Sequence, residues 1–262
     1  MASASPPPPG ATPPSADLRG KRALVTGGSR GIGRGIALAL AAAGADVAIG
    51  YRREKDAADA TVKAIEGHGR RGFAFAADVR DAGAVREMVQ GAHAALGGLD
   101  VVVANAGVAT RFQPLHEVDP GYWQRVLDID LNGVFYTLHA ALPILRAQRS
   151  GVILTVSSIA ADFMGANGGP YVAAKCAVNG ITKVVARENA DLNVRANVIA
   201  PGLIATDIAD GMLARHGDAI VKSIPLRRMG TPEECGALAA YLASDAAAWI
   251  TGKVFRIDGG QW

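Results

Sequence analysis

Short apolar runs alternate with longer amphipathic stretches from Leu18 to the end of the chain. Most of the short runs are apolar throughout, which is typical of strands buried on both faces of a parallel sheet. Their separation by helix-length segments predicts an α/β fold with one doubly wound parallel sheet of about seven strands and helices on both faces. The predicted strands are Arg22–Thr26, Asp46–Tyr51, Gly72–Asp78, Asp100–Asn105, Gly151–Ser157, Val194–Ala200 and Lys253–Asp258.

This arrangement predicts where a ligand would bind. Right-handed crossovers place the loops that follow the strands along one edge of a parallel sheet, and ligands of such folds bind at that edge. We therefore look for functional residues immediately after the predicted strands.

The first seventeen residues differ in composition from the rest. They hold six of the thirteen prolines, and after Met1 they contain no aliphatic side chain larger than that of alanine. A secretory signal would need an apolar segment here. Because proline and small polar residues bury little surface, we expect residues 1–17 to form a disordered tail and residues 18–262 to form a single folded domain.

Composition and charge exclude several classes of protein. The chain has 262 residues, 27 Lys and Arg against 24 Asp and Glu, and is half hydrophobic. The small basic excess includes no basic block, and no apolar run approaches the ~18 residues that cross a membrane, so we expect neither a nucleic-acid nor a membrane partner. Cys176 and Cys235 are too far apart for a zinc motif, so we expect no metal. We also expect a cytoplasmic location. None of the histidines has metal-ligand spacing; they are His68, His93, His116, His139 and His216.

The loop after the first predicted strand is rich in glycine. It reads TGGSRGIG over residues 26–33, just before a helix-like segment. Gly27 permits a tight turn, Gly31 lets the backbone approach a diphosphate, and Gly33 allows the helix to pack against the strand. The diphosphate would lie at the helix N-terminus, which favours an anion. The strict G-x-G-x-x-G spacing is absent and a plain glycine-rich turn is the alternative, but the position between strand and helix favours a dinucleotide.

Basic residues stand where the second predicted strand ends. A site that prefers NAD usually presents a carboxylate there, whereas this chain has Arg52 and Arg53 after Tyr51. Together with Arg30 of the glycine loop, they could hold a 2′-phosphate by charge-assisted hydrogen bonds. We therefore expect NADP(H) to be favoured over NAD(H), with Arg30 and Arg52 as the discriminating pair. Solvated surface arginines are the alternative.

A tyrosine and a lysine share one face of a predicted helix that runs from Pro170 to about Asp191. Tyr171 and Lys175 are four residues apart, a spacing that brings their side chains together. This spacing alone is weak support for a site, but Ser158 ends the preceding strand on the ligand-binding edge.

Taken together, these motifs resemble the short-chain dehydrogenase/reductase family over nearly everything after Leu18. The resemblance implies a Rossmann-type fold, a nicotinamide cofactor and a catalytic group formed by Ser158, Tyr171 and Lys175. The matching segments are TGGSRGIG at 26–33, Asp78-Val79, Asn105-Ala106-Gly107, Ser158, YVAAK at 171–175, Ala200-Pro201-Gly202 with Thr206, and Asp258-Gly259-Gly260.

The same resemblance implies the residues that contact the cofactor. Asp78 and Val79 would touch the adenine, the loop of Asn105 to Gly107 would line the adenosine side, and Pro201 to Thr206 would border the nicotinamide. The full expected set is Gly27, Ser29, Arg30, Gly31, Ile32, Gly33, Arg52, Asp78, Val79, Asn105, Ala106, Gly107, Tyr171, Lys175, Pro201, Gly202, Ile204 and Thr206.

The residue types suit the reduction of a ketone to a secondary alcohol. Hydride transfer to the carbonyl carbon leaves an alkoxide, so a proton donor must stand beside the oxygen, and we expect Tyr171 to be that donor. A free phenol ionises only near pH ~10, and the cation of Lys175 would favour its phenolate. Ser158 would donate a hydrogen bond to the substrate oxygen. The alternative is that Tyr171 packs as an ordinary helix aromatic and that Ser158 is a helix cap.

One segment departs from the family pattern. The family usually has Asn in a segment N-L-x-G-V-F, whereas this chain has Asp130 followed by Leu-Asn-Gly-Val-Phe. Asn132 stands two residues later and would face another way on a helix. Asp130 would add a negative charge that could pair with Lys175, and the fourth catalytic role stays open.

The substrate is the least determined feature. We expect its pocket to include the loop that follows Ser158 and a lid over residues 208–227, with Arg227 and Arg228 available to an anionic substrate. The likeness is greatest to 3-oxoacyl-(acyl-carrier-protein) reductases, followed by reductases of sugars, polyols or xenobiotic ketones. Family likeness also suggests a homotetramer. A dinucleotide-binding sensor without turnover is the competing class, and the retained Ser158, Tyr171 and Lys175 favour the enzyme.

Overall fold

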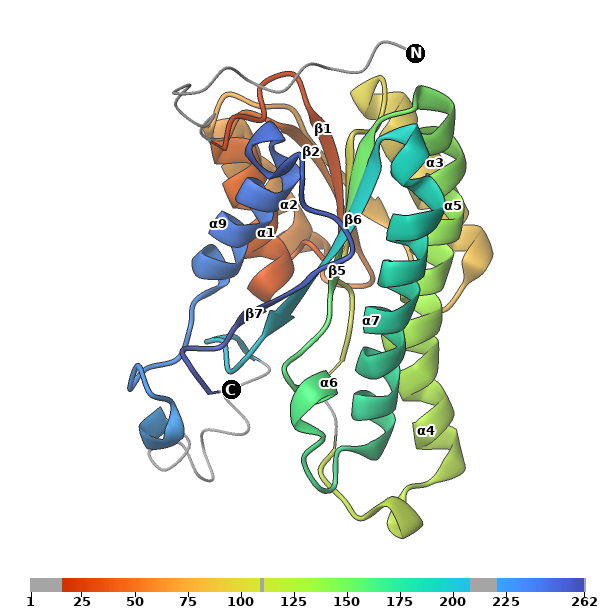
Figure 1. Ribbon diagram of the computed structural model, residues 1–262. Helices are drawn as coiled ribbons and strands as arrows, with labels where there is room; N and C mark the ends of the chain where they lie inside the picture. The colour runs from red at the N-terminus through yellow and green to blue at the C-terminus, as the bar shows by residue number, and fades with distance from the viewer. Residues whose placement is uncertain (1–15, 109–110, 208–220, 262) are drawn as a thin grey trace.

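A single parallel sheet forms the centre of the computed structural model, which describes residues 16–108, 111–207 and 221–261 (Figure 1). Its seven strands follow the order β3-β2-β1-β4-β5-β6-β7, and every neighbouring pair is parallel. The order reverses direction between β1 and β4, which is the point where doubly wound sheets bind ligands. The predicted fold class is confirmed. Most of the predicted tail, residues 1–15, lies outside the described residues.

All seven predicted strands are present, with ends that differ by at most two residues from those predicted. Their bounds are β1 Arg22–Thr26, β2 Asp46–Tyr51, β3 Gly72–Ala76, β4 Val101–Ala104, β5 Gly151–Val156, β6 Val194–Pro201 and β7 Val254–Ile257. The five inner strands are almost wholly buried, whereas β3 and β7 at the edges are largely half-buried. The edges lack a second neighbouring strand and full helix cover, so burial is less complete there than the apolar runs indicated.

Helices cover both faces of the sheet (Figure 1). One face carries α1 Gly31–Ala42, α2 Lys55–Gly67 and α9 Pro232–Ala243, and the other carries α3 Ala82–Leu96, α5 Gly133–Gln148 and α7 Gly169–Asn189. The shorter helical segments are η1 Leu115–Glu117, α4 Pro120–Leu127, η2 Asp128–Asn132, α6 Ala160–Phe163, η3 Ala190–Leu192 and η4 Asp245–Ala247. The helix expected after Pro170 begins at Gly169 and ends at Asn189. Helices α4 and α5 are joined by η2, a π-helical turn.

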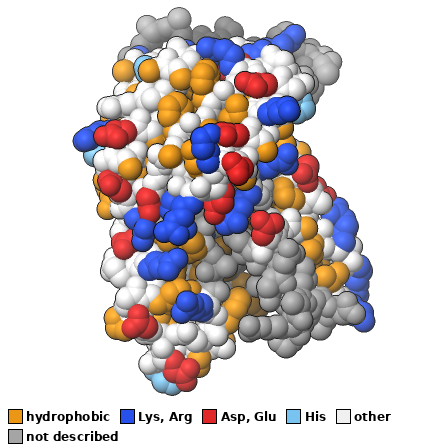
Figure 2. Space-filling view, turned by 180° about the vertical axis from the view of Figure 1, so that it is seen from behind, with side chains coloured by type: hydrophobic (Ala, Val, Ile, Leu, Met, Phe, Trp, Pro, Cys, Tyr) orange, Lys and Arg blue, Asp and Glu red, His pale blue; other side chains and the backbone are white. Residues whose placement is uncertain are grey.

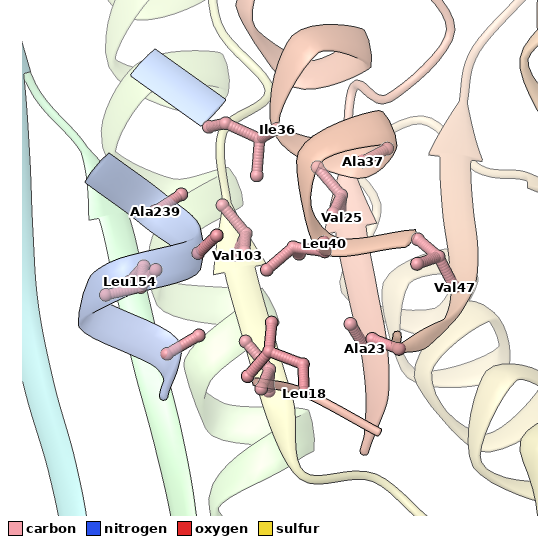
Figure 3. Packing of buried hydrophobic residues seen from close by; sticks show 14 of the residues in the cluster. Leu18, Ala23, Val25, Ile36, Ala37, Leu40, Val47, Val103, Leu154 and Ala239 are labelled. Atoms are coloured by element: carbon pink, nitrogen blue, oxygen red, sulfur yellow. The ribbon is translucent and has the colours of Figure 1, made fainter. Parts of the chain in front are cut away.

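Two hydrophobic cores hold these layers together, one on each face of the sheet. Figure 3 shows the first core, where Leu40 of α1 and Ala239 of α9 pack with Val25 and Val103 of the central strands. The second core joins Leu24, Val102 and Ile153 of the same strands to α3, α5 and α7. Because side chains alternate along a strand, β1 and β4 contribute to both cores. Their fixed position supports the loops that follow them.

Helices α1 and α9 touch backbone to backbone. A Cβ on Gly35 would overlap the carbonyl of Pro232, and a Cβ on Gly236 would stand 2.5 Å from the carbonyl oxygen of Gly35. A capping box formed by Thr231 and Glu234 fixes where α9 begins. This close crossing holds α1 and α9 side by side on the same face of the sheet.

The surface carries charges of both signs. Basic and acidic side chains stand next to one another on the face shown in Figure 2, with small hydrophobic patches between them. No helix among the described residues is long and apolar enough to span a membrane.

Replacement of Gly35 by Ala should destabilise the fold. The added methyl group has no room against the Pro232 carbonyl, and such overpacking costs about 1–3 kcal/mol. Gly67→Ala at the exposed end of α2 is the matched control, because a Cβ there meets nothing within 4 Å. Urea unfolding should show a loss of stability for Gly35→Ala alone, and equal free energies of unfolding for the two variants would contradict the packing argument.

Candidate active site

A cavity of about 680 Å³ opens at the carboxyl ends of the strands. The loops after β1, β4, β5 and β6 line it, together with α7 and the π-helical turn η2. Every site residue predicted from the sequence lies in this lining, including Ser158, Tyr171 and Lys175. The topology therefore brings together residues that are spread over nearly two hundred positions of the chain.

The glycine loop has the backbone that its sequence indicates. Gly27 and Gly31 have φ angles of +65° and +54°, a region that L side chains rarely adopt. A Cβ on Gly33 would overlap the Gly27 carbonyl and crowd the Asn105 amide, so Gly33 packs against the loop itself rather than against the strand as expected. Arg30 at the N-cap makes no side-chain hydrogen bond to the first turn of α1. The N-terminal N–H groups of α1 therefore face a cavity that suits an anion.

Hydrogen bonds tie the loops after β1 and β4 to each other. The hydroxyl of buried Thr26 accepts from the backbone N–H groups of Asn105 at 3.0 Å and Ala106 at 3.1 Å. The Asn105 side-chain amide donates back to the carbonyls of Thr26 at 2.9 Å and Gly27 at 3.2 Å. These reciprocal bonds fix the shape of the glycine loop.

Charged side chains cluster at the end of the cavity formed by the glycine loop and the segment after β2. Arg30 lies 4.0 Å from Glu54 and 3.7 Å from Asp207, in weak exposed contacts. Asp78 pairs with Arg80 at 2.5 Å, and the hydrogen bond from Arg80 lowers the pKa of Asp78 to about 2, with a smaller contribution from the charge of Arg52. A carboxylate is thus present near Arg30, but it comes from Glu54 rather than from the strand end.

Tyr171, Lys175 and Ser158 lie together in the cavity lining. The Lys175 ammonium lies 5.4 Å from the centre of the Tyr171 ring and donates to the Val156 carbonyl at 3.2 Å. The hydroxyl of Ser157 donates to the Lys175 carbonyl, which locks α7 to the end of β5. Ser158 accepts from the Ala160 N–H at 3.1 Å, so its own proton can be donated to a ligand oxygen.

Asp130 forms a buried ion pair with Lys175. Their oxygen and nitrogen atoms are 3.1 Å apart, and the side chains are 0% and 4% exposed. Burial alone would lower the pKa of Lys175, but the charge of Asp130 and the neighbouring Tyr171 raise the pKa above its ordinary value. Burial raises the pKa of Asp130, against the pull of Lys175. The ion pair between Asp130 and Lys175, which the sequence left open, is therefore present in the structure.

The substrate side of the cavity is mostly apolar. Phe112, Phe163 and Val172 line it beside Ser158 and Tyr171, and Phe112 and Phe163 are 64% and 54% exposed. Arg228, which the sequence offered to an anionic substrate, instead pairs with Glu234 at 2.6 Å. Most of the expected lid, residues 208–220, lies outside the described residues.

The arrangement suits a dinucleotide. The open N-terminus of α1 would accept the diphosphate, Gly27 and Gly31 leave the backbone uncovered, and Lys175 and Tyr171 stand at the far end. No group of three or more potential metal ligands occurs among the described residues.

Comparison with known proteins places the chain in a family. A family model described as enoyl-(acyl carrier protein) reductase matches residues 27–261. The 3-oxoacyl-(acyl-carrier-protein) reductase FabG of Staphylococcus aureus is 41% identical over 246 residues, which cover 92% of this chain and 98% of that protein. The chain belongs to the short-chain dehydrogenase/reductase family. It is an oxidoreductase of that family, as its relatives are named reductases and dehydrogenases.

Solved structures of the short-chain dehydrogenase/reductase family superpose closely. One from Mycobacterium marinum has a TM-score of 0.89 at 37% identity, over 94% of this chain and 97% of that chain. A 7α-hydroxysteroid dehydrogenase in complex with NADH and 7-oxo glycochenodeoxycholic acid has a TM-score of 0.89 at 30% identity, over 94% and 95% of the two chains.

Sequence reasoning missed several residues of the cavity. Thr26 was recognised as the end of a strand and the start of the glycine loop, but the role of its hydroxyl in joining two loops was not. Glu54 and Asp207 both approach Arg30 from segments that carry no motif. A polar residue at the end of a buried strand was the signal that could have drawn attention to Thr26. The carboxylates of Glu54 and Asp207 could be assigned to the site only from the folded chain.

Thr26→Val should weaken dinucleotide binding and lower stability. Valine has nearly the shape of threonine but cannot accept hydrogen bonds from Asn105 and Ala106, and unpaired buried N–H groups cost about 1–3 kcal/mol. Thr26→Ser keeps the hydroxyl and should retain binding. Calorimetric titration with NADPH would measure both dissociation constants, and equal values for the two variants would refute the role of the hydroxyl.

Proposed function

We propose that this chain is an NADPH-dependent reductase that converts ketones to secondary alcohols, with 3-oxoacyl thioesters as its first candidate substrates. The observation that carries this proposal is the grouping of Tyr171, Lys175 and Ser158 at one wall of a cavity fit for a dinucleotide. The relatives named 3-oxoacyl-(acyl-carrier-protein) reductases support the substrate class, because they match over nearly their whole length. A homotetramer and a cytoplasmic location stay predictions.

Tyr171 acts as the general acid in this reaction. When bound, the reduced nicotinamide supplies a hydride to the carbonyl carbon. The Tyr171 hydroxyl transfers its proton to the carbonyl oxygen, so the C=O double bond becomes a C–O single bond and new C–H and O–H bonds form. The phenolate then regains a proton from solvent. In the reverse direction, the phenolate takes the proton of the alcohol.

Lys175 and Ser158 support this proton transfer in different ways. The Lys175 ammonium, held by Val156 and Asp130, stabilises the phenolate formed on Tyr171 and reaches the ribose side of the cavity. Ser158 donates its hydroxyl proton to the substrate oxygen, which orients the carbonyl and stabilises developing negative charge.

Arg30 and Arg52 favour the phosphorylated dinucleotide. Both line the adenosine end of the cavity, and Arg30 has only loose contacts with Glu54 and Asp207. A 2′-phosphate carries more charge than either carboxylate and accepts several hydrogen bonds from guanidinium groups, so it would replace those contacts. Without the phosphate, Glu54 and Asp207 are nearby carboxylates that could accept from a ribose hydroxyl of NADH.

A ring ketone is the second candidate substrate. The exposed apolar side chains of Phe112, Leu115, Phe163 and Met164 gather near the cavity and would suit a rigid alicyclic body. The similar steroid dehydrogenase holds such a 7-oxo compound. A non-catalytic dinucleotide sensor is the remaining alternative.

A substrate panel separates these candidates. NADPH consumption would be followed by absorbance with 3-oxoacyl thioesters, an enoyl thioester, a 7-oxo steroid and a ketose. We expect the 3-oxoacyl thioesters to give the highest kcat/KM. Preference for the steroid would favour the ring ketone, and NADPH binding without turnover of any compound would favour the sensor.

Tyr171→Phe should abolish turnover and leave dinucleotide binding largely intact. The change removes only the hydroxyl that donates the proton, so kcat should fall by at least ~100-fold. Rates of NADPH oxidation and the dissociation constant of NADPH would be measured on the same preparation. A variant with near-normal rates would show that the acid is another residue.

Arg52→Ala should raise the KM for NADPH by about tenfold and leave the KM for NADH nearly unchanged, because a hydrogen bond to a charged group contributes about 1.5–3 kcal/mol. Arg53→Ala is the matched control, since Arg53 is the adjacent arginine and does not line the cavity. Steady-state kinetics with both dinucleotides test this. Similar KM values for NADPH and NADH in the unaltered protein would rule out the preference.

A further inference from the structure

The charge next to Tyr171 is a pair rather than a single ammonium. Lys175 is almost fully buried, and its nitrogen lies 3.1 Å from a carboxylate oxygen of Asp130, which is itself wholly buried. The Asp130 oxygens also accept from the Val108 N–H at 3.3 Å. Both partners of Asp130 are donors, which is the environment of an ionised carboxylate.

The π-helical turn η2 directs Asp130 inward. Ile129 and Asp130 are buried in this turn, whereas the Asp128 carboxylate accepts from Gln124 at 2.8 Å and Asn132 at 3.0 Å on the outer side. A Cβ on Gly107 would stand 2.6 Å from the Asp130 oxygen, so the absence of a side chain there makes room for the carboxylate. The site is therefore shaped around this group.

Few other charges face the pair. Among the described residues, Asp130 and Tyr171 are the groups whose charges act on Lys175. Tyr122 of α4 accepts from the Arg111 N–H, and Cys176 of α7 contacts the Ala161 carbonyl. The other charged or titratable groups of the cavity lining stand toward the adenosine end; they are Arg30, Tyr51, Arg52, Glu54, Asp78 and Asp207.

We infer that Asp130 is a positioning residue that neutralises Lys175 and thereby keeps the proton on Tyr171 up to higher pH than an unpaired lysine would. This inference deepens the proposed function and rests on it. Two opposite charges 3.1 Å apart form a dipole, and the potential of a dipole falls off faster with distance than that of one charge. The pair therefore stabilises a phenolate on Tyr171 less than a lone ammonium would. As a result, ketone reduction continues up to a higher pH than it would beside an unpaired lysine.

Asp130→Asn tests this, because the amide keeps the shape of the carboxylate and removes its charge. The pH profile of kcat/KM would be measured for NADPH-dependent reduction and for NADP⁺-dependent oxidation with a substrate found in the panel above. We expect the alkaline fall of reduction and the rise of oxidation both to move to lower pH by about one unit, the lower end of the shift that a nearby charge causes.

Asp128→Asn is the matched control. It makes the same chemical change two residues away on the outer side of η2 and should leave both profiles in place. A structural role for Asp130 would lower rates or stability without moving the profiles, and that outcome would overturn the inference. A shift to higher pH would also overturn it, because it would show that Asp130 mainly keeps Lys175 protonated.

A second variant guards against one that does not fold. Asp130→Ser also removes the charge and should move the profiles in the same direction. Profiles that stay in place in both variants would refute the inference. Absence of any carbonyl reduction by the unaltered protein would instead refute the proposed function.

Discussion

The mutual hydrogen bonding of the loops after β1 and β4 is the constraint on which the rest of the site depends. These strands are neighbours where the strand order reverses, so their loops leave in different directions and need a connection. Thr26 and Asn105 provide it, since each satisfies backbone groups of the opposite loop. The glycine loop can then leave its N–H groups open, because its own shape does not depend on a ligand.

Burial explains why the part of the cavity around Lys175 is built differently from the part around Arg30. Arg30 and Arg52 stand near solvent, where ion pairs are weak and a ligand can exchange with them. Lys175 and Asp130 stand inside, where neither charge is stable without the other. The side chains around Arg30 can therefore exchange their partners when a ligand binds, whereas Lys175 and Asp130 are held in place before any ligand binds.

Much of the fold and of the candidate site could be predicted from the sequence, because the patterns that indicate them lie within short segments of the chain. Apolar runs identified β1 to β7, and glycine and the spacing of Tyr171 and Lys175 identified the loops and the helix that line the cavity. The reduced burial of β3 and β7 follows from strand order, which no local pattern reports. The approach of Glu54 to Arg30 and the π-helical form of η2 likewise depend on how distant segments meet.

The π-helical turn also limits how the family can vary at this place. Deletion of one residue from Asp128–Asn132 would shift this wider turn toward ordinary α-helical geometry and change the direction in which Asp130 points. A shorter loop could not compensate, because α4 joins α5 through η2 with no loop between them. We therefore expect homologues to differ in length in the connections around η1 and α6. Homologues that have a buried acidic residue at the position of Asp130 should keep the same number of residues from Pro120 to Gln148.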